Sequence, residues 1–252
     1  MKILRLFLWM AVLAVFLVGC AKKPKVDPRR SAQTHYQLGL AYFNIGSYQQ
    51  ALPEFAKAVE LNPSDPLYHD ALAMAFMFNR QLDAAISEFQ EAIRIDPKFV
   101  EAKNNLASAY LLNGDLEMAR ATLKEVLKDP FYVTPQFAYF NLARIFEREG
   151  NIDDAIREYR RALDIDRDYV DAHNNLGRLH LQQGKNDLAI GEFTEATRLQ
   201  PRVALYQRNL GVAYVQAGKT KKARMSFQRV LELERDGPSA EYARRMLEEL
   251  KQ

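Results

Sequence analysis

The residues best suited to chemistry are one cysteine, Cys20, and four histidines, His35, His69, His173 and His180. A thiol can attack an electrophile, accept an acyl group or bind a metal, and an imidazole can bind a metal or transfer a proton. A lone cysteine cannot close an internal disulfide or build a thiolate metal cage. His35, His69 and His173 recur at one phase of a repeat, which indicates packing instead of a metal site.

Motifs for catalysis or cofactor binding are missing from the sequence. The serines lack the context of a nucleophile elbow, and there is no glycine-rich loop that could hold a phosphate. Charge runs such as residues 157–161 are typical of a solvated helix face with ion pairs four residues apart. We therefore predict no catalytic residue, no metal, no cofactor and no small-molecule substrate, and we expect that the protein is not an enzyme.

The elements that would position a binding site follow from a pattern that returns every 34 residues from Ala32 onward, with one break. The seventh residue of each unit is leucine: Leu38, Leu72, Leu106, Leu142, Leu176 and Leu210. The twenty-fourth is large and apolar: Phe55, Phe89, Leu123, Tyr159, Phe193 and Phe227. Glycine or alanine stands at the eighth place and alanine at the twentieth. This spacing puts the large side chains on one stripe of each of two helices, and the small residues let those helices approach closely.

This is the tetratricopeptide pattern, in which every unit is a helix pair. We expect an all-α fold, a right-handed superhelical solenoid of six tetratricopeptide (TPR) helix pairs with a C-terminal capping helix. A glycine follows the first helix of five units, where it can take the left-handed conformation that ends a helix. Arg80 stands there in the second unit, so we expect a different turn at that place.

The predicted domains follow the repeat. Units one to three occupy residues 32–135, units four to six occupy 136–237, and the capping helix occupies 238–252. The register shifts once, by two additional residues before the fourth unit. They lie in segment 128–135, whose two prolines and two aromatic residues indicate an ordered loop that divides the solenoid in two.

The N-terminal residues have the pattern of a secretory targeting signal. A basic start, residues 1–5, precedes an apolar run from Leu6 to Val18 that is shorter than the ~20 residues of a comfortable membrane span. The run ends in Leu17-Val18-Gly19-Cys20, which resembles the lipobox of bacterial lipoproteins. The alternative is an uncleaved membrane anchor with an incidental cysteine.

The lipobox resemblance implies a signal peptide over residues 1–19 and acylation of Cys20, palmitate included. The membrane would then be a partner through these acyl chains, and residues 20–31 would form an extended basic tether. Ala21, a residue other than aspartate after the cysteine, implies the periplasmic face of the outer membrane.

The concave face of such a solenoid is the candidate protein-binding groove. In units one to three we expect nine apolar residues to line it: Tyr36, Leu40, Phe43, Leu67, Met74, Met77, Phe78, Leu111 and Leu112. Methionine and aromatic side chains make an adaptable surface for an apolar peptide or helix. The alternative is that neighbouring repeats bury these residues. The net charge of +3 gives no reason to expect nucleic acid as a partner.

Lipobox, six repeats and the longer junction before unit four together resemble the outer-membrane pilotin lipoproteins of type IV pilus biogenesis. The stretch 131–142, with its aromatic residues and Pro135, is similar to the junction of that family. The resemblance implies that the apolar groove of units one to three, called the front groove below, binds a subunit of the secretin pore or another envelope protein. It also implies that the protein assists assembly of the pore in the outer membrane. The alternative is a periplasmic adaptor that regulates a peptidoglycan hydrolase or synthase, or that serves another secretion or envelope assembly.

Overall fold

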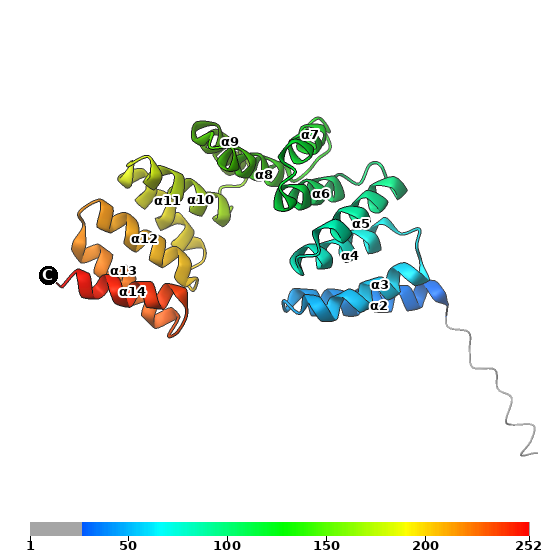
Figure 1. Cartoon of the computed structure of the whole chain (residues 1–252), viewed down its shortest axis with the longest axis horizontal. Helices are drawn as coiled ribbons and strands as arrows, with labels where there is room; N and C mark the ends of the chain where they lie inside the picture. Colours follow the sequence, from blue (N-terminus) through cyan, green and yellow to red (C-terminus); the bar gives the residue numbers. More distant parts are fainter. Residues whose placement is uncertain (1–26, 252) are drawn as a thin grey trace, which may run out of the picture.

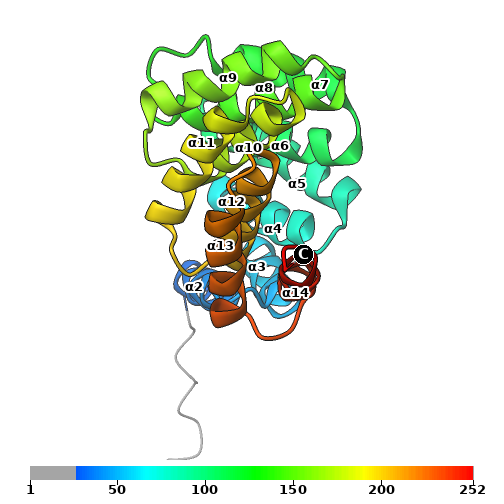
Figure 2. The ribbon, with the colours of Figure 1, turned by 90° about the vertical axis from the view of Figure 1, so that its left-hand side faces the viewer.

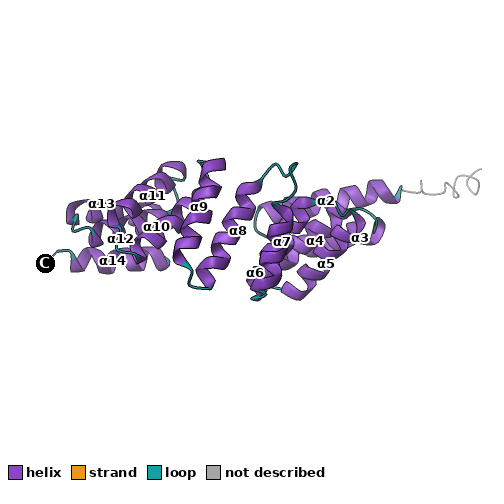
Figure 3. Ribbon diagram, turned by 90° about the horizontal axis from the view of Figure 1, so that it is seen from above, coloured by secondary structure: helices purple, strands orange, loops and turns teal. Residues whose placement is uncertain are grey.

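The computed structural model describes residues 27–251, so the expected signal peptide, Cys20 and most of the tether lie outside the described part. The helices are α2 (Pro28–Asn44), α3 (Tyr48–Leu61), α4 (Pro66–Phe78), α5 (Leu82–Ile95), α6 (Val100–Asn113), α7 (Leu116–Val126), α8 (Pro135–Arg148), α9 (Ile152–Ile165), α10 (Val170–Gln182), α11 (Asn186–Leu199), α12 (Ala204–Gln216), α13 (Thr220–Leu233) and α14 (Pro238–Glu249). Figure 3 shows only helices and loops in the described region. None of the helices within 27–251 has the length and apolar character to cross a membrane.

The helix pairs stack into an arch, with α2 at one end and α14 at the other (Figure 1). The first helices of the middle pairs, α6, α8 and α10, lie toward the inside, and α7, α9 and α11 lie outside. Turned by 90°, the arch still has α2 and α14 at its open side (Figure 2). The expected all-helical solenoid of six pairs with a capping helix is therefore confirmed.

Each pair is held by a large side chain against a small one. Phe227 of α13 is fully buried, and a Cβ built on Gly211 of α12 would lie 2.6 Å from its ring. Gly39 faces Phe55 in the same way in the first unit. Close packing of this kind leaves no volume for an added methyl group. The spacing of small and large residues therefore sets the distance between the two helices of a unit.

The turn of the second unit corrects our expectation. Arg80 has φ 65°, in the left-handed region where glycine stands in the other units, as Gly46 does with φ 76°. The amides of Arg80 and Gln81 donate to the carbonyls of Met77 and Phe76, at 3.1 and 2.9 Å, which is the pattern of the glycine turns. The two hydrogen bonds hold the same turn although a side chain makes this conformation less favourable.

The first helix begins earlier than predicted. Helix α2 starts at Pro28, so residues 28–31 are helical and do not belong to an extended tether. The Asp27 carboxylate accepts a hydrogen bond of 3.0 Å from the amide of Arg29, and proline suits the first helical position. Within residues 27–251 no helix pair precedes this unit, and its Leu38 is 42 % exposed, whereas Leu72 at the same place in the second unit is 5 % exposed.

The predicted terminal cap and the junction loop are both present. Tyr242, Met246, Leu247 and Leu250 of α14 and its C-terminus pack on the core of the last unit. Between α7 and α8 the chain is ordered by Asp129, whose carboxylate accepts from the amide of Phe131 at 2.9 Å.

Three histidines pair with glutamates across the two helices of their units. The Nδ1 atoms of His35, His69 and His173 each lie 2.7 Å from a glutamate Oε2, and the partners are Glu54, Glu88 and Glu192. Nε2 of His69 also lies 3.1 Å from the carbonyl oxygen of Pro63. These oxygens favour the doubly protonated ring, so the hydrogen bond to Glu88 and that carbonyl raise the pKa of His69 although burial lowers it. The histidines at this repeated position therefore join the two helices of their units through hydrogen bonds to glutamate.

The close approach of small and large residues can be tested with two glycines. Gly211→Ala should lower the free energy of unfolding by about 1–3 kcal/mol, because the new methyl group overlaps buried Phe227. Gly191→Ala in α11 is the control, since a Cβ there meets nothing within 4 Å. It should stabilise the helix by about 0.5–1 kcal/mol. Urea unfolding followed by circular dichroism measures both, and equal effects would contradict the packing described.

Candidate functional site

The front half of the concave face is built from α2, α4 and α6, the first helices of units one to three. Tyr36, Leu40 and Phe43 of α2 are half-buried and pack on the core that the first and second units share. From α4, Leu67 is 50 % and Phe78 47 % exposed. The predicted groove therefore keeps apolar surface open to solvent, but its floor also belongs to the core.

Helix α6 contributes less to the groove than predicted. Leu111 is fully buried and cannot contact a ligand, whereas Leu112 is half-buried. The cause is the close approach of α8: the Asn141 amide donates to Ser108 at 2.9 Å, and the Arg148 guanidinium donates to the carbonyl of Leu111. Met74 and Met77 of α4 are partly buried against the same core. The accessible apolar surface is thus concentrated on α2 and α4.

Three aromatic rings meet at one end of this surface. The Phe78 ring stacks on Tyr48 with centroids 4.8 Å apart and meets Phe43 edge-on at 5.3 Å. Tyr48 is the first residue of helix α3. The repeat pattern does not predict it as a groove residue, because only the first helix of each unit is expected to line the concave face. Together these rings form a rigid apolar platform, the kind of surface that dominates binding energy in protein interfaces.

One carboxyl group stands among the apolar residues of the groove. Asp70 of α4 accepts a hydrogen bond of 3.1 Å from the amide of Asn105 of α6. Burial raises its pKa from 3.8 to about 6; the Asn105 amide lowers the pKa and the nearby Glu101 raises it. The front groove is therefore uncharged at this point in mild acid and negative at neutral pH.

The rear half of the concave face is not purely polar. Phe137 of α8 is 40 % exposed and lies edge-on to Tyr169 at 5.5 Å, and Phe140 contacts the same ring at 4.9 Å. Two of its charged groups form an ion pair: Arg178 donates to Glu147 at 2.7 Å, and Glu147 also accepts from the hydroxyl of Tyr159. Apolar exposure thus extends past the third unit into the rear half of the concave face.

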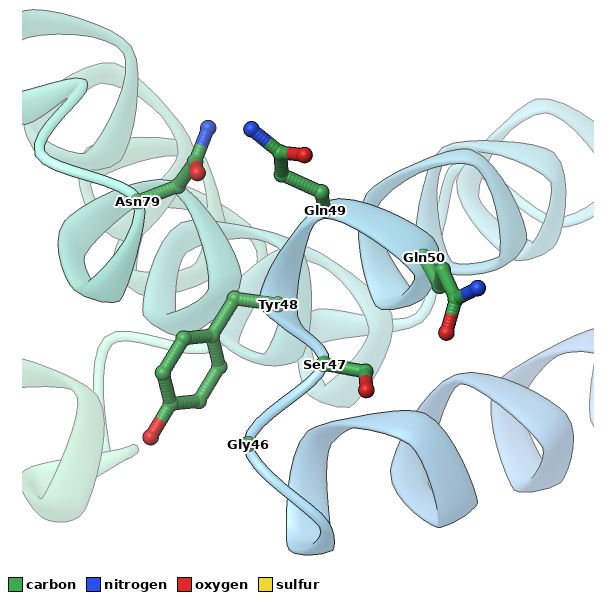
Figure 4. A pocket seen from close by; sticks show the side chains of 6 residues that line it. All are labelled: Gly46, Ser47, Tyr48, Gln49, Gln50 and Asn79. Carbon is green, nitrogen blue, oxygen red and sulfur yellow. The ribbon is translucent and has the colours of Figure 1, made fainter.

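The hollow at the first inter-helix turn is a product of the repeat. It has a volume of about 450 Å³ and is lined by Gly46, Ser47, Tyr48, Gln49, Gln50 and Asn79 (Figure 4). The corresponding turn of the fourth unit, around Gly150 and Asn151, forms a hollow of about 460 Å³. Because equivalent residues of different type produce the same hollow, we assign it to backbone geometry. Among residues 27–251, no group of three or more His, Cys, Asp or Glu side chains could hold a metal ion.

The repeats match known family models. Four models described as tetratricopeptide or TPR repeats match residues 32–65, 79–130, 143–184 and 174–241. The chain is a tetratricopeptide-repeat protein, and its fold is a scaffold for protein–protein interaction. A comparison with curated protein sequences finds no match.

Solved structures with the same fold come from several systems. A chain of the APC/C hetero-tetramer Cut9–Hcn1 matches with TM-score 0.74 and 17 % identity, over 86 % of this chain and 43 % of that one. PilF of Pseudomonas aeruginosa matches with TM-score 0.69 and 18 % identity, over 89 % of this chain and 98 % of its own. PilW, a widely conserved type IV pilus biogenesis factor, matches with TM-score 0.72 and 19 % identity, over 88 % and 98 %. At these identities the likeness shows the fold alone.

The half-buried carboxyl group of Asp70 in the groove makes stability depend on pH. Because the folded pKa of Asp70 is about 6 and its ordinary value 3.8, the folded chain holds the proton more tightly between these values. The contribution of Asp70 to the free energy of unfolding should therefore fall as pH rises from about 4 to 6. Asp70→Asn should remove this fall, a gain over the wild type of up to roughly 3 kcal/mol at pH 7.

Chemical denaturation at several pH values measures this difference. Asp187→Asn is a control of opposite sign, because the Lys219 ammonium lowers the pKa of exposed Asp187. The contribution of Asp187 to the free energy of unfolding should be present above its ordinary pKa of 3.8 and be lost as pH falls below that value. A parallel pH dependence of Asp70→Asn and the wild type would show that Asp70 is not buried as described.

Proposed function

We propose that this protein is a lipid-anchored scaffold that acts as a pilotin, binding an apolar segment of a secretin subunit and assisting assembly of the pore in the outer membrane. The observation that carries the proposal is the exposed apolar surface of α2 and α4, with Leu67 and Phe78 about half exposed. A folded monomer gains nothing from exposing such side chains along one face of a helix, and exposed apolar patches mark binding sites. The protein serves as a scaffold and carries out no catalysis.

The anchor and the destination rest on the sequence. The lipobox-like segment 17–20 supports acylation of Cys20, and Ala21 supports the outer membrane. Several acyl chains would hold the protein firmly, since each buried methylene contributes ~0.8 kcal/mol. Placing both anchor and groove on one chain would let the scaffold carry its partner to the membrane.

Two solved structures support the pilus as the setting. PilF and PilW are covered over 98 % of their lengths, so the likeness extends through the whole array of repeats and not only through one unit. PilW is a type IV pilus biogenesis factor. The arch, the junction and the lipobox then have a common purpose, which is presentation of the front groove at the membrane.

The groove can be tested by adding charge to its aromatic platform. Phe78→Glu should reduce recovery of the secretin subunit with the scaffold from solubilised envelopes at least tenfold, because a carboxylate cannot be desolvated against Phe43 and Tyr48. Met225→Glu is the matched control, since Met225 of α13 is 61 % exposed and lies outside the groove. Circular dichroism verifies that both variants fold. Equal recovery with both would refute the groove, and capture of a peptidoglycan enzyme in place of the secretin would favour the adaptor.

The carrier role can be tested separately at the cysteine. Cys20→Ser should remove the acyl chains, which mass spectrometry of the N-terminal peptide detects. The variant protein should be absent from the outer-membrane fraction. Secretin multimers should be lost while secretin monomers persist. Normal multimers in a strain with this variant would contradict the carrier role but would leave the groove untouched.

A further inference from the structure

The outer side of the arch has a cleft between the third and fourth units, next to the shift in the repeat. Helix α7 has 11 residues and ends at Val126, whereas α5 has 14 residues and continues to Ile95. The turn of helix that would cover the side of α8 is therefore missing, and the chain leaves into the junction loop. Figure 1 shows α7 and α9 on the outer edge of the arch on either side of α8.

A cleft of about 440 Å³ lies at this place, and its lining comes from α7, α8 and α9. Its floor includes Tyr139, Leu142 and Phe146 of α8. Cavities of about 300–1,000 Å³ with an apolar floor are typical of ligand sites. A cleft of about 470 Å³ lies at the equivalent place between the fourth and fifth units, with Ile156 and His180 where Arg120 and Phe146 stand here. The repeat itself therefore forms the hollow, and the apolar floor from α8 distinguishes this one.

Cations surround the apolar floor. Arg120 lies over the Phe146 ring at 5.2 Å and pairs with Glu149. Arg161 lies over the Tyr139 ring at 5.7 Å and donates to Glu158 at 3.2 Å. These contacts hold both guanidinium groups over the aromatic rings of the floor.

The charge of the cleft is positive. Glu158 is 4 % exposed, and the carboxylate is neutralised by Arg161 and also by Arg157, which donates to it at 3.3 Å. Lys124 and Lys128 are exposed at the rim, and within residues 27–251 neither forms an ion pair. Two ammonium groups are thus free to pair with a bound anion, directly above an apolar floor.

We propose that this cleft binds an acidic peptide segment that carries one bulky apolar residue. The apolar side chain would fill the space over Tyr139 and Phe146, and neighbouring carboxylates would pair with Lys124 and Lys128. Charge complementarity of this kind gives specificity and speeds association. A recessed cleft between helices suits an inserted side chain better than a flat lipid surface. The site is separate from the front groove and does not depend on the proposed function.

Fluorescence anisotropy with labelled pentapeptides and the full-length protein in detergent tests the proposal. The probes are Asp-Glu-Trp-Glu-Asp and the same peptide with alanine in the centre. The tryptophan peptide should bind at least fivefold more tightly, because only its side chain fills the floor. Its affinity should fall as ionic strength rises from about 0.05 M to about 0.5 M, since the lysine pairs at the rim are exposed to salt.

Lys124→Glu combined with Lys128→Glu should weaken binding of the tryptophan peptide at least tenfold. Arg202→Glu with Lys221→Glu is the matched control: both residues are exposed on other units, and the change in charge is the same. Phe78→Glu should leave this binding unchanged, which separates the cleft from the groove. If both double variants lost the same affinity for the tryptophan peptide, the effect would be due to the net charge of the protein alone, and the proposal would be overturned.

Two further outcomes would also overturn the proposal. One is equal affinity for the tryptophan and alanine peptides, because the floor would then have no role. The other is binding of vesicles that contain phosphatidylglycerol, lost in the Lys124→Glu and Lys128→Glu variant, when neither peptide binds. That result would assign the cations to anionic lipid.

Discussion

The structure depends on one contact repeated six times, a large apolar side chain of the second helix against a small residue of the first. Phe227 against Gly211 and Tyr159 against Ala143 are two forms of it, and both large side chains are fully buried. The contact fixes the separation of the two helices and thereby the surface on which the next pair packs. The curvature of the arch, and so the concave face, follows from this local choice of residue size.

Most of the fold could be predicted because its determinants lie within one unit. Leucine, alanine and aromatic residues at fixed places define both helices, and the shift before Gln136 located the junction loop. The start of α2 could also have been found, since Asp27 followed by Pro28 is a helix-start signal. The turn at Arg80 could not, because the hydrogen bonds that hold its conformation belong to the folded unit.

The candidate site was predicted less completely because exposure depends on how units meet. Leu111 has the position of a groove residue, yet α8 covers it after the junction changes the path of the chain. Tyr48 joins the groove from a second helix, which a rule based on first helices omits. The raised pKa of Asp70 arises from burial between repeats. Such properties belong to pairs of units, and no single period of the sequence encodes them.

The two ends of the solenoid differ, and this has a mechanical consequence. In the described part of the chain, residues 27–251, the last unit is covered by α14, whereas no helix covers Leu38 of the first unit. A pulling force that enters through the N-terminus reaches the uncovered pair first and meets only its contact with the second unit. Because each pair touches only its neighbours, the array would yield by peeling one unit at a time. The chain would then lengthen in steps under tension while the distal units keep their shape.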